Sequence, residues 1–503
     1  MKKPFYILGL LLVTLGVLVF ILSRHGKPVE SSAEVLTVHC AAALQKPVRE
    51  IARQYEMEYG TRIRLNFAGS GVLASQIKVS GGDLYIPADS SYIGPMKAEG
   101  LVLESTDLAR LRAVVVVRKG NPRNIRSMDD LARRGVRISV GEPTAAIGSF
   151  VRRVLMESGD WERISPQILV TKPTVNNVVE DVATGAVDAG LAWDAVASQF
   201  KDVELVRVPV FEDIPRCATA GILRGAEVPA ALHFMRYLAA TGRGRDVFEK
   251  MGFTVPAVAD SWTDAPVLTL FAGSMLRPAI EDRLRLFEQR EGCRIKTVFD
   301  GCGTLLARMN ENDAGAMPSA YFPCDSTFLS DVKDRFGPGM IITSNEIVML
   351  VPKGNPRGLK KLDDLSKIGL RVGLADAGKS ALGKLTMDMM MRYGCWDELH
   401  DSGNVVVLAS KGEELANQMQ SGALDAALIY LSNAMASPGM MADCKIIRLR
   451  QPDAIAHQPF VVAHDTPYPQ MVLRLRDFIT HDDARSRFEQ LGFKFIKREW
   501  TDE

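Results

Sequence analysis

Apolar residues recur along the first half of the chain with two alternating periods. Residues 35–40 form a short apolar run rich in β-branched side chains, which is typical of a buried strand. Residues 47–59 then place apolar side chains along one helix face, and Gly60 ends that pattern. This half of the chain is therefore predicted to begin with a strand followed by a helix.

The same alternation continues through the rest of this half. The predicted strands are residues 62–67, 111–117, 136–140 and 189–193. The predicted helices are residues 72–79, a short helix capped by Ser127, residues 147–158 and residues 234–251. Strands that alternate with helices predict an α/β fold, in which helices cover both faces of mainly parallel sheets. Ligands in such folds bind at the carboxyl ends of strands and at helix N-termini.

The second half of the chain repeats the sequence motifs of the first half. FAGSGVLA at 67–74 is echoed by FDGCGTLLA, VRKGNP by VPKGNP, TGAVDAGLAW by SGALDAALIY, and FEKMGF by FEQLGF, in the same order. The separation of well over two hundred residues is far longer than a solenoid repeat. The sequence therefore predicts two tandem copies of one domain, at residues 34–264 and 265–503.

The N-terminus has a different composition. Lys2 and Lys3 precede an uncharged apolar run at residues 4–22, which is long enough to cross a bilayer as a slightly tilted helix. Basic residues follow directly, and small residues suited to a cleavage site return only at 31–33. We predict a transmembrane signal anchor, and a cleaved signal peptide remains the alternative. Either predicts that both copies lie at the periplasmic or extracellular face, with the anchor holding them to the cytoplasmic membrane.

Composition and charge exclude several functions. The 503 residues have a net charge of +1 and no basic stripe with interleaved aromatics, so no nucleic-acid partner is expected. The seven histidines and seven cysteines show neither H-x-x-x-H nor C-x-x-C spacing, so no metal site or cofactor is predicted. The cysteines can be buried small hydrophobes, or one or two disulfides can form in an exported protein.

Two short patterns resemble catalytic motifs, but neither of them supports catalysis. His39 and Cys40 are adjacent in a predicted strand, so their side chains point to opposite faces and cannot readily act together. Ser70 lies between two glycines but lacks the G-x-S-x-G elbow and a histidine partner. We therefore expect that the protein is not an enzyme.

Four loops in each copy connect a strand to a helix and are rich in Gly, Ala and Ser. Small residues let the backbone N–H groups at a helix start approach a ligand closely, and the helix dipole favours an anion there. Several such helix starts converging on one point would hold a tetrahedral oxyanion without Lys or Arg. The loops are residues 41–43, 69–71, 144–149 and 174–177, and then 272–274, 301–303, 377–383 and 410–413.

Five segments of the chain resemble those of a known family. They are FAGSGVLASQI, DLYIPAD, KGNP, LAWDAVAS and MGFTVP. The chain resembles the periplasmic molybdate/tungstate-binding proteins of ABC transporters, which have the type 2 periplasmic-binding-protein fold. The resemblance implies two α/β lobes around a cleft in each copy. It also implies that serine hydroxyls, backbone amides and a tyrosine hydroxyl hold an oxyanion, which is delivered to an ABC permease.

The resemblance assigns ligand positions in both copies. The second copy has Ser274, Cys302, Gly383, Gly412 and Tyr430 there. The first copy has Ala43, Ser70, Gly148, Val175 and Trp193 there. Neither copy has the family's full donor set, so a membrane-tethered sensor or interaction module with degenerate clefts remains the alternative.

The donors also bear on which anion fits. A site made only of donors suits fully deprotonated molybdate, tungstate or sulfate, whereas hydrogen phosphate carries a proton that needs an acceptor. The acidic residues of the loops that could supply one are Glu142, Asp376, Glu413 and Glu414.

Overall fold

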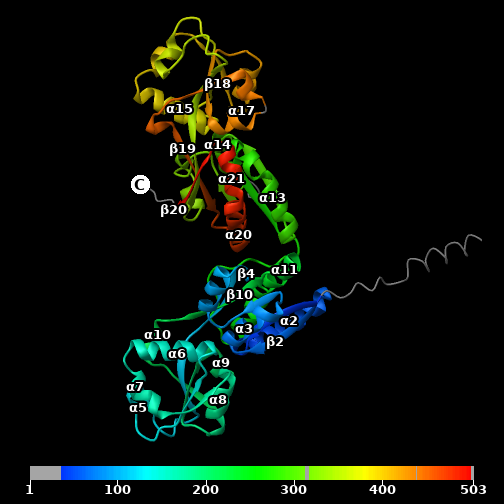
Figure 1. The fold of residues 1–503 in the computed structure, drawn as a ribbon, viewed down its shortest axis with the longest axis vertical. Helices are drawn as coiled ribbons and strands as arrows, with labels where there is room; N and C mark the ends of the chain where they lie inside the picture. Colours follow the sequence, from blue (N-terminus) through cyan, green and yellow to red (C-terminus); the bar gives the residue numbers. More distant parts are fainter. Residues whose placement is uncertain (1–34, 312–316, 438, 500–503) are drawn as a thin grey trace, which may run out of the picture. The chain divides into compact units, whose positions relative to one another are not determined.

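The computed structural model describes residues 35–311, 317–437 and 439–499, and the chain forms two compact units (Figure 1). The first unit runs to Ala239 and includes Arg243–Pro256. The second takes Ala240–Gly242 and the chain from Ala257 onwards. The predicted membrane segment at 4–22 lies outside the described residues, and within them no helix is long and apolar enough to cross a membrane.

The first unit contains two five-stranded sheets, one in each lobe. The order of the first is β2-β1-β3-β10-β4, with β1, β2 and β3 parallel and β10 antiparallel to its neighbours. The order of the second is β7-β6-β8-β5-β9, with β6, β7 and β8 parallel. The strands are β1 Val35–Ala41, β2 Arg62–Ala68, β3 Leu84–Ile86, β4 Val102–Leu111, β5 Ala113–Arg118, β6 Ile138–Gly141, β7 Ile168–Lys172, β8 Ala189–Trp193, β9 Val203–Val206 and β10 Arg216–Leu223.

Helices pack on these sheets through the apolar faces that the sequence predicts. Val48, Ile51 and Tyr55 of α2 are buried, and Gly60 ends this helix in the left-handed conformation with φ 73°. Ser127 caps α5 in a capping box with Asp130. The helices are α2 Gln45–Tyr59, α3 Ser70–Ser80, α4 Ile93–Ala98, α5 Met128–Leu131, α6 Ala146–Glu157, α7 Trp161–Ile164, α8 Val175–Thr184, α9 Asp194–Ala197, α10 Pro209–Glu212, α11 Val228–Ala239 and α12 Gly244–Lys250.

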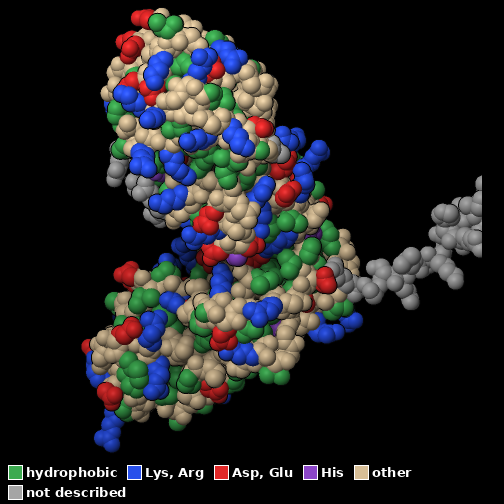
Figure 2. Space-filling view, turned by 45° about the horizontal axis from the view of Figure 1, so that its top comes forward, with side chains coloured by type: hydrophobic (Ala, Val, Ile, Leu, Met, Phe, Trp, Pro, Cys, Tyr) green, Lys and Arg blue, Asp and Glu red, His purple; other side chains and the backbone are tan. Residues whose placement is uncertain are grey.

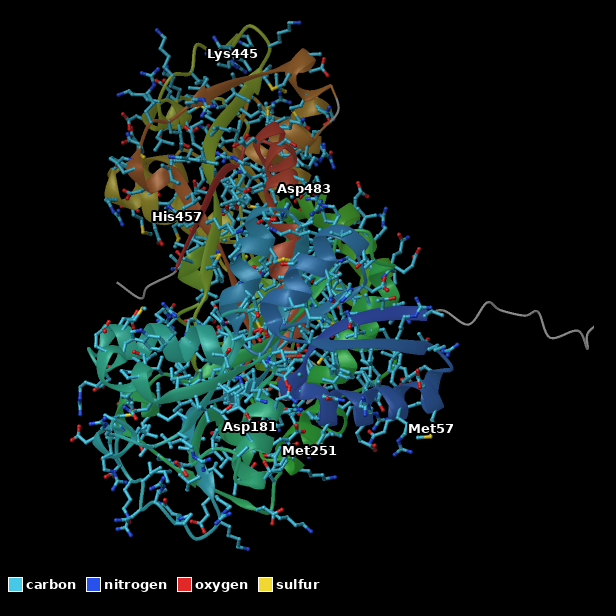
Figure 3. All side chains as sticks on the ribbon, turned by 60° about the horizontal axis from the view of Figure 1, so that its bottom comes forward. Met57, Asp181, Met251, Lys445, His457 and Asp483 are labelled. Atoms are coloured by element: carbon cyan, nitrogen blue, oxygen red, sulfur yellow. The ribbon has the colours of Figure 1, made fainter. Side chains whose placement is uncertain are left out.

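Hydrogen bonds and ion pairs between side chains also connect helices to strands in this unit. Asp181 of α8 accepts a hydrogen bond from the Ser139 hydroxyl of β6 at 2.9 Å and pairs with Lys172 Nζ at 3.1 Å (Figure 3). On the surface, basic and acidic side chains are interspersed over the face shown in Figure 2, in keeping with the small net charge.

Two predicted elements are divided differently in the structure. The strand predicted at 111–117 begins at Ala113, because Leu111 ends β4 in one lobe and Arg112 connects it to β5 in the other. The single helix predicted at 234–251 is two helices, α11 and α12. Gly242 adopts φ 81° between them, and the Thr241 N–H donates to the Asp260 carbonyl. The backbone there leaves the helical path to join the second unit.

The second unit repeats this order of strands, but one strand joins its two lobes and an additional strand, β20, ends it. Its strand β14 runs unbroken for 13 residues, pairing with β19 and β20 in one lobe and with β17 and β18 in the other. The two lobes therefore share one ten-stranded sheet. The strands are β11 Val267–Gly273, β12 Arg294–Asp300, β13 Ala320–Phe322, β14 Met340–Pro352, β15 Val372–Ala375, β16 Val405–Ala409, β17 Ala426–Tyr430, β18 Cys444–Arg448, β19 Ile455–Val462 and β20 Lys494–Glu499.

The helices of the second unit follow the strands in the same way as in the first. They are α13 Arg277–Glu291, α14 Cys302–Asn310, α15 Ala381–Arg392, α16 Trp396–Asp401, α17 Gly412–Gln420, α18 Leu431–Ala436, α19 Met440–Asp443, α20 Pro469–Ile479 and α21 Asp482–Gln490. All seven cysteines are free thiols, five of them buried, so the structure favours packing over disulfides.

A buried ion pair joins α13 to α20. Arg474 donates to both carboxylate oxygens of Glu291, at 3.2 and 2.9 Å, and the Glu291 side chain has no exposed surface. Replacing Arg474 by Met should lower the free energy of unfolding of the second unit by about 3–5 kcal/mol, because it removes both hydrogen bonds that Arg474 donates to a buried carboxylate. Urea denaturation measures the change. Arg485→Met, which removes an exposed pair with Glu489, should cost under about 0.5 kcal/mol, and equal effects would contradict the expectation.

Candidate functional site

A small cavity lies in the first unit where its two lobes meet. Its volume is about 20 Å³, close to the space that one water molecule needs. Apolar and small side chains dominate its wall, and no acidic residue lines it. The lining residues are Ala41, Ala42, Ala43, Ala68, Gly69, Ser70, Ala88, Ala145, Ala146, Ile147, Thr174, Val175 and Trp193.

Three helices begin at this cavity. Ser70, Ala146 and Val175 are the first residues of α3, α6 and α8, which have 11, 12 and 10 residues. The first N–H groups of a helix have no partner within it, and they carry the positive end of the helix dipole. The Ser70 hydroxyl oxygen accepts the Ala88 N–H at 3.2 Å, which leaves the hydroxyl proton available to a ligand. Donors from three helix starts and the Ser70 hydroxyl thus lie at the cavity.

The two lobes of the first unit are closed over the cavity. The Gly71 N–H donates to the Thr144 carbonyl at 2.9 Å, and Asn176 Nδ2 donates to the Ala42 carbonyl at 3.3 Å. The hydroxyls of Tyr92 and Ser149 lie 3.2 Å apart, also across the two lobes. An anion with four oxygens can enter only if these contacts open.

Glycines at the predicted amide positions permit close approach of the backbone. A Cβ on Gly148 would lie 2.1 Å from the Glu142 carbonyl oxygen, and one on Gly383 would lie 2.5 Å from the Ala375 carbonyl oxygen. Any side chain would therefore move the start of α6 or α15 away from the strand end. Trp193 closes the cavity on another side, with its ring 5.5 Å from that of Phe150.

The second unit places its predicted residues at equivalent points. Cys302, Gly383 and Gly412 lie in the first turns of α14, α15 and α17, and Tyr430 ends β17. Ser274 directly follows β11, as Ala42 directly follows β1. The residue equivalent to Ser274 is therefore Ala42, the neighbour of the predicted Ala43, and both alanines line the first cavity.

A cysteine pair replaces the serine contact in the second unit. The Cys302 sulfur accepts the Cys324 N–H at 3.1 Å, as Ser70 accepts the N–H of Ala88. Both thiols are buried. The adjacent Cys302 sulfur, together with burial, holds the pKa of Cys324 well above its usual value. The Cys324 thiol therefore stays protonated at neutral pH.

An acid also contacts the predicted ligand residues of the second unit, whose arrangement is called the second cleft. Ser274 Oγ donates to Glu413 Oε2 at 3.1 Å, and desolvation raises the pKa of Glu413. Two of the other acids in the loops bond locally. Asp376 accepts from the Gly378 N–H, and Glu414 accepts from Ser410. The two clefts therefore differ in charge although their folds match.

Contacts of Glu413, Asn433 and Cys324 could not be read from one sequence. A Cβ on Gly412 would lie 2.1 Å from Asn433 Oδ1, so the glycine makes room for that amide. The hydroxyl of Tyr430 is buried and has no hydrogen-bond partner within the described part of the chain. The only sequence signal was the repeat itself, which aligns Glu413 with Asn176.

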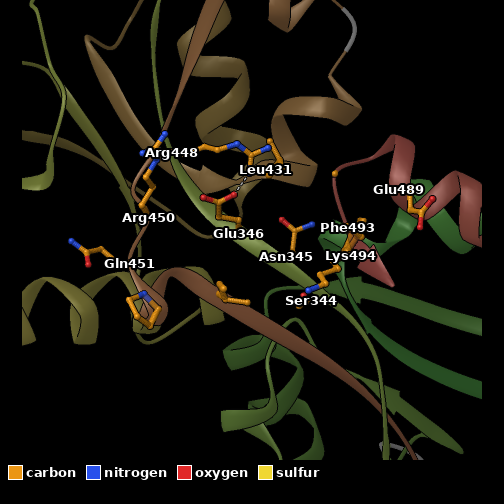
Figure 4. A pocket seen from close by; sticks show the side chains of 13 residues that line it. Ser344, Asn345, Glu346, Leu431, Arg448, Arg450, Gln451, Glu489, Phe493 and Lys494 are labelled. Atoms are coloured by element: carbon orange, nitrogen blue, oxygen red, sulfur yellow. Dashed lines mark hydrogen bonds and ion pairs between the residues drawn. The ribbon is translucent and has the colours of Figure 1, made fainter. Parts of the chain in front are cut away.

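A separate hollow of about 660 Å³ in the second unit is built differently (Figure 4). It lies beside the middle of β14 and mixes basic side chains such as Arg450 and Lys494 with acidic ones such as Glu489. Arg448 in its wall is already paired with Glu346. Because charged side chains line much of it, it does not resemble the first cavity.

Comparisons with known proteins agree with the repeat. The profile of the bacterial extracellular solute-binding protein family matches residues 36–254 and again 268–494. A molybdate-binding protein of Mycobacterium tuberculosis is 30% identical over 230 residues, which are 44% of this chain and 86% of that protein. The Escherichia coli molybdate-binding protein is 27% identical over 233 residues, 44% of this chain and 89% of its own.

Solved structures are similar over one copy at a time. The Azotobacter vinelandii periplasmic molybdate-binding protein has a TM-score of 0.38 and 19% identity, and covers 44% of this chain and 99% of its own. The Mycobacterium tuberculosis sulfate-binding protein has a TM-score of 0.39 and 16% identity, and covers 46% of this chain and 87% of its own.

The close approach at Gly148 can be tested by substitution. Gly148→Ala should lower the free energy of unfolding of the first unit by about 1–3 kcal/mol, because the added methyl overlaps a backbone carbonyl. Thermal or urea unfolding measures the change. Gly94→Ala is the matched control, since its Cβ meets nothing within 4 Å, and it should be neutral or slightly stabilising. A neutral Gly148→Ala would show that the contact is not tight.

Proposed function

The chain belongs to the family of bacterial extracellular solute-binding proteins, and we propose that its solute is a tetrahedral oxyanion, molybdate or tungstate. In this proposal the first unit captures the anion outside the cytoplasm and delivers it to an ABC permease. The role is one of binding and transport, without a catalytic step.

The donor-lined cavity of the first unit is the observation that supports this proposal. The Ser70 hydroxyl and the starts of α3, α6 and α8 meet there, without an acid in its wall. Such a site favours an anion that carries no proton, because it offers donors and no acidic side chain lines it. Two relatives that match one copy over most of their length carry the name of molybdate-binding proteins.

Binding would work through the lobes of the first unit. The chain passes between them at Arg112 and again between β9 and β10. An anion that touches donors from both lobes favours the closed form, in which Gly71 reaches Thr144 and Asn176 reaches Ala42. The closed form would then be the one that docks on the permease.

The proposed location follows from the apolar segment at 4–22. As an uncleaved anchor, it would hold both units at the outer face of the cytoplasmic membrane, close to the permease. The family match supports an extracytoplasmic location.

A second role, as a sensor or interaction module, is supported for the second unit alone. In its cleft, Glu413 accepts a hydrogen bond from Ser274, the serine that the resemblance assigns to the ligand. An anion would therefore meet a carboxylate there. In that case the first unit transports and the second makes contacts to other proteins.

Calorimetric titration of residues 33–503 tests the main proposal. Molybdate and tungstate should each bind with one equivalent per chain at neutral pH, and phosphate should bind much more weakly because its proton lacks an acceptor. Ser70→Ala should weaken molybdate binding by about 1.5–3 kcal/mol, or roughly ten- to a hundredfold, because one donor to the anion is lost.

Ser274→Ala is the matched control, since it removes the serine of the other cleft and should leave the affinity unchanged. The absence of heat with molybdate, tungstate and sulfate would reject the oxyanion assignment. Loss of binding in Ser274→Ala alone would move the site to the second unit.

A further inference from the structure

We propose that Glu413 is an internal ligand of the second cleft, whose carboxylate takes the place of an oxyanion oxygen and so keeps dianions out. The inference rests on the proposed function only for the choice of molybdate as the probe. It makes Glu413 the residue that determines specificity between the two copies.

The contact of Glu413 is equivalent to one in the first unit, but the donor and the acceptor are exchanged between the two lobes. Asn176 is the second residue of α8, and its amide donates to the backbone carbonyl of Ala42 at 3.3 Å. Glu413 is the second residue of α17, and its carboxylate accepts from the side chain of Ser274, which follows β11 as Ala42 follows β1. The same lobe-to-lobe contact thus has a neutral donor in one copy and an anionic acceptor in the other.

The position of the carboxylate is the one that an anion would take. Glu413 lies in the first turn of α17, a helix of nine residues, where the dipole favours negative charge. The Ser274 hydroxyl donates to it at 3.1 Å. A serine hydroxyl is one of the donors that the oxyanion of the first unit is proposed to use.

Neighbouring charges do not cancel the carboxylate. Lys411 of the same loop pairs with Asp300 at 3.1 Å, and Arg277, after the Ser274 turn, pairs with Glu281 at 3.0 Å. Glu414 adds a further negative charge beside it. Desolvation by burial raises the pKa of Glu413 and Glu414 acts in the same direction, although Lys411 and the hydrogen bond from Ser274 act against them. A dianion beside Ser274 would therefore meet like charge, which is strongly unfavourable.

Donors nevertheless remain in the second cleft. The Tyr430 hydroxyl is buried without a hydrogen-bond partner in the described residues, and it ends β17 at the edge where the helices start. Gly383 keeps the start of α15 close to the strand end, as Gly148 does in the first unit. Removing the charge of Glu413 should therefore uncover a working anion site.

Molybdate titration of the wild type, Glu413→Gln and Glu414→Gln at neutral pH tests the inference. Glutamine keeps the size of the side chain and an oxygen that can accept from Ser274, so the fold should be retained, as unfolding temperatures check. Glu413→Gln should bind one equivalent more than the wild type, with a gain in second-cleft affinity of at least about a hundredfold. Glu414→Gln, which removes the adjacent exposed charge, should bind as the wild type does.

The double variant Glu413→Gln with Ser274→Ala should weaken or lose the extra equivalent, which assigns it to the second cleft. Equal stoichiometry in the wild type and Glu413→Gln overturns the inference, whether the shared value is zero, one or two. One equivalent in both leaves the proposed function intact, and zero in both rejects that too. An extra equivalent in Glu413→Gln with none in the wild type supports the inference while rejecting capture by the first unit.

Discussion

The first N–H groups of each helix that follows a strand have no acceptor within that helix, and the arrangement of both clefts depends on satisfying them. In each unit several such helices begin at neighbouring strand ends, so donors that lack an acceptor in their own helix lie close together. Glycines such as Gly148 and Gly383 allow this meeting, because a single Cβ would collide with a backbone carbonyl. The site is thus built mainly from backbone, which tolerates large changes of side chain between the copies.

This backbone origin explains how two copies can share a fold and differ in charge. Ser70 and Cys302 accept equivalent N–H groups although one is a hydroxyl and the other a thiol. Asn176 and Glu413 span the same gap with opposite polarity. Substitutions at the cleft therefore change which anion is tolerated without changing how the lobes are made.

The sequence predicted the fold well where periodicity and caps were strong. The strand and helix over 35–59 and the Ser127 cap agree with the structure, and the repeat predicted a second unit of the same topology. The prediction of one closing helix at 234–251 was wrong. Its apolar spacing continues past Gly242, but the backbone conformation of that glycine interrupts the helix. The ligand positions are close to the clefts, but contacts such as Ser274 to Glu413 depend on how two lobes meet, which local periodicity does not contain.

The unbroken strand β14 has a consequence for how the second unit exchanges its amide hydrogens. Because its ladder continues from the β19 side to the β17 side, no residue at the crossing is left outside the sheet. In the first unit, Arg112 lies between the two strands at the corresponding crossing. Amides near Glu346 and Ile347 should therefore become accessible to deuterium only when both lobes open together, whereas those flanking Arg112 can exchange by a local opening.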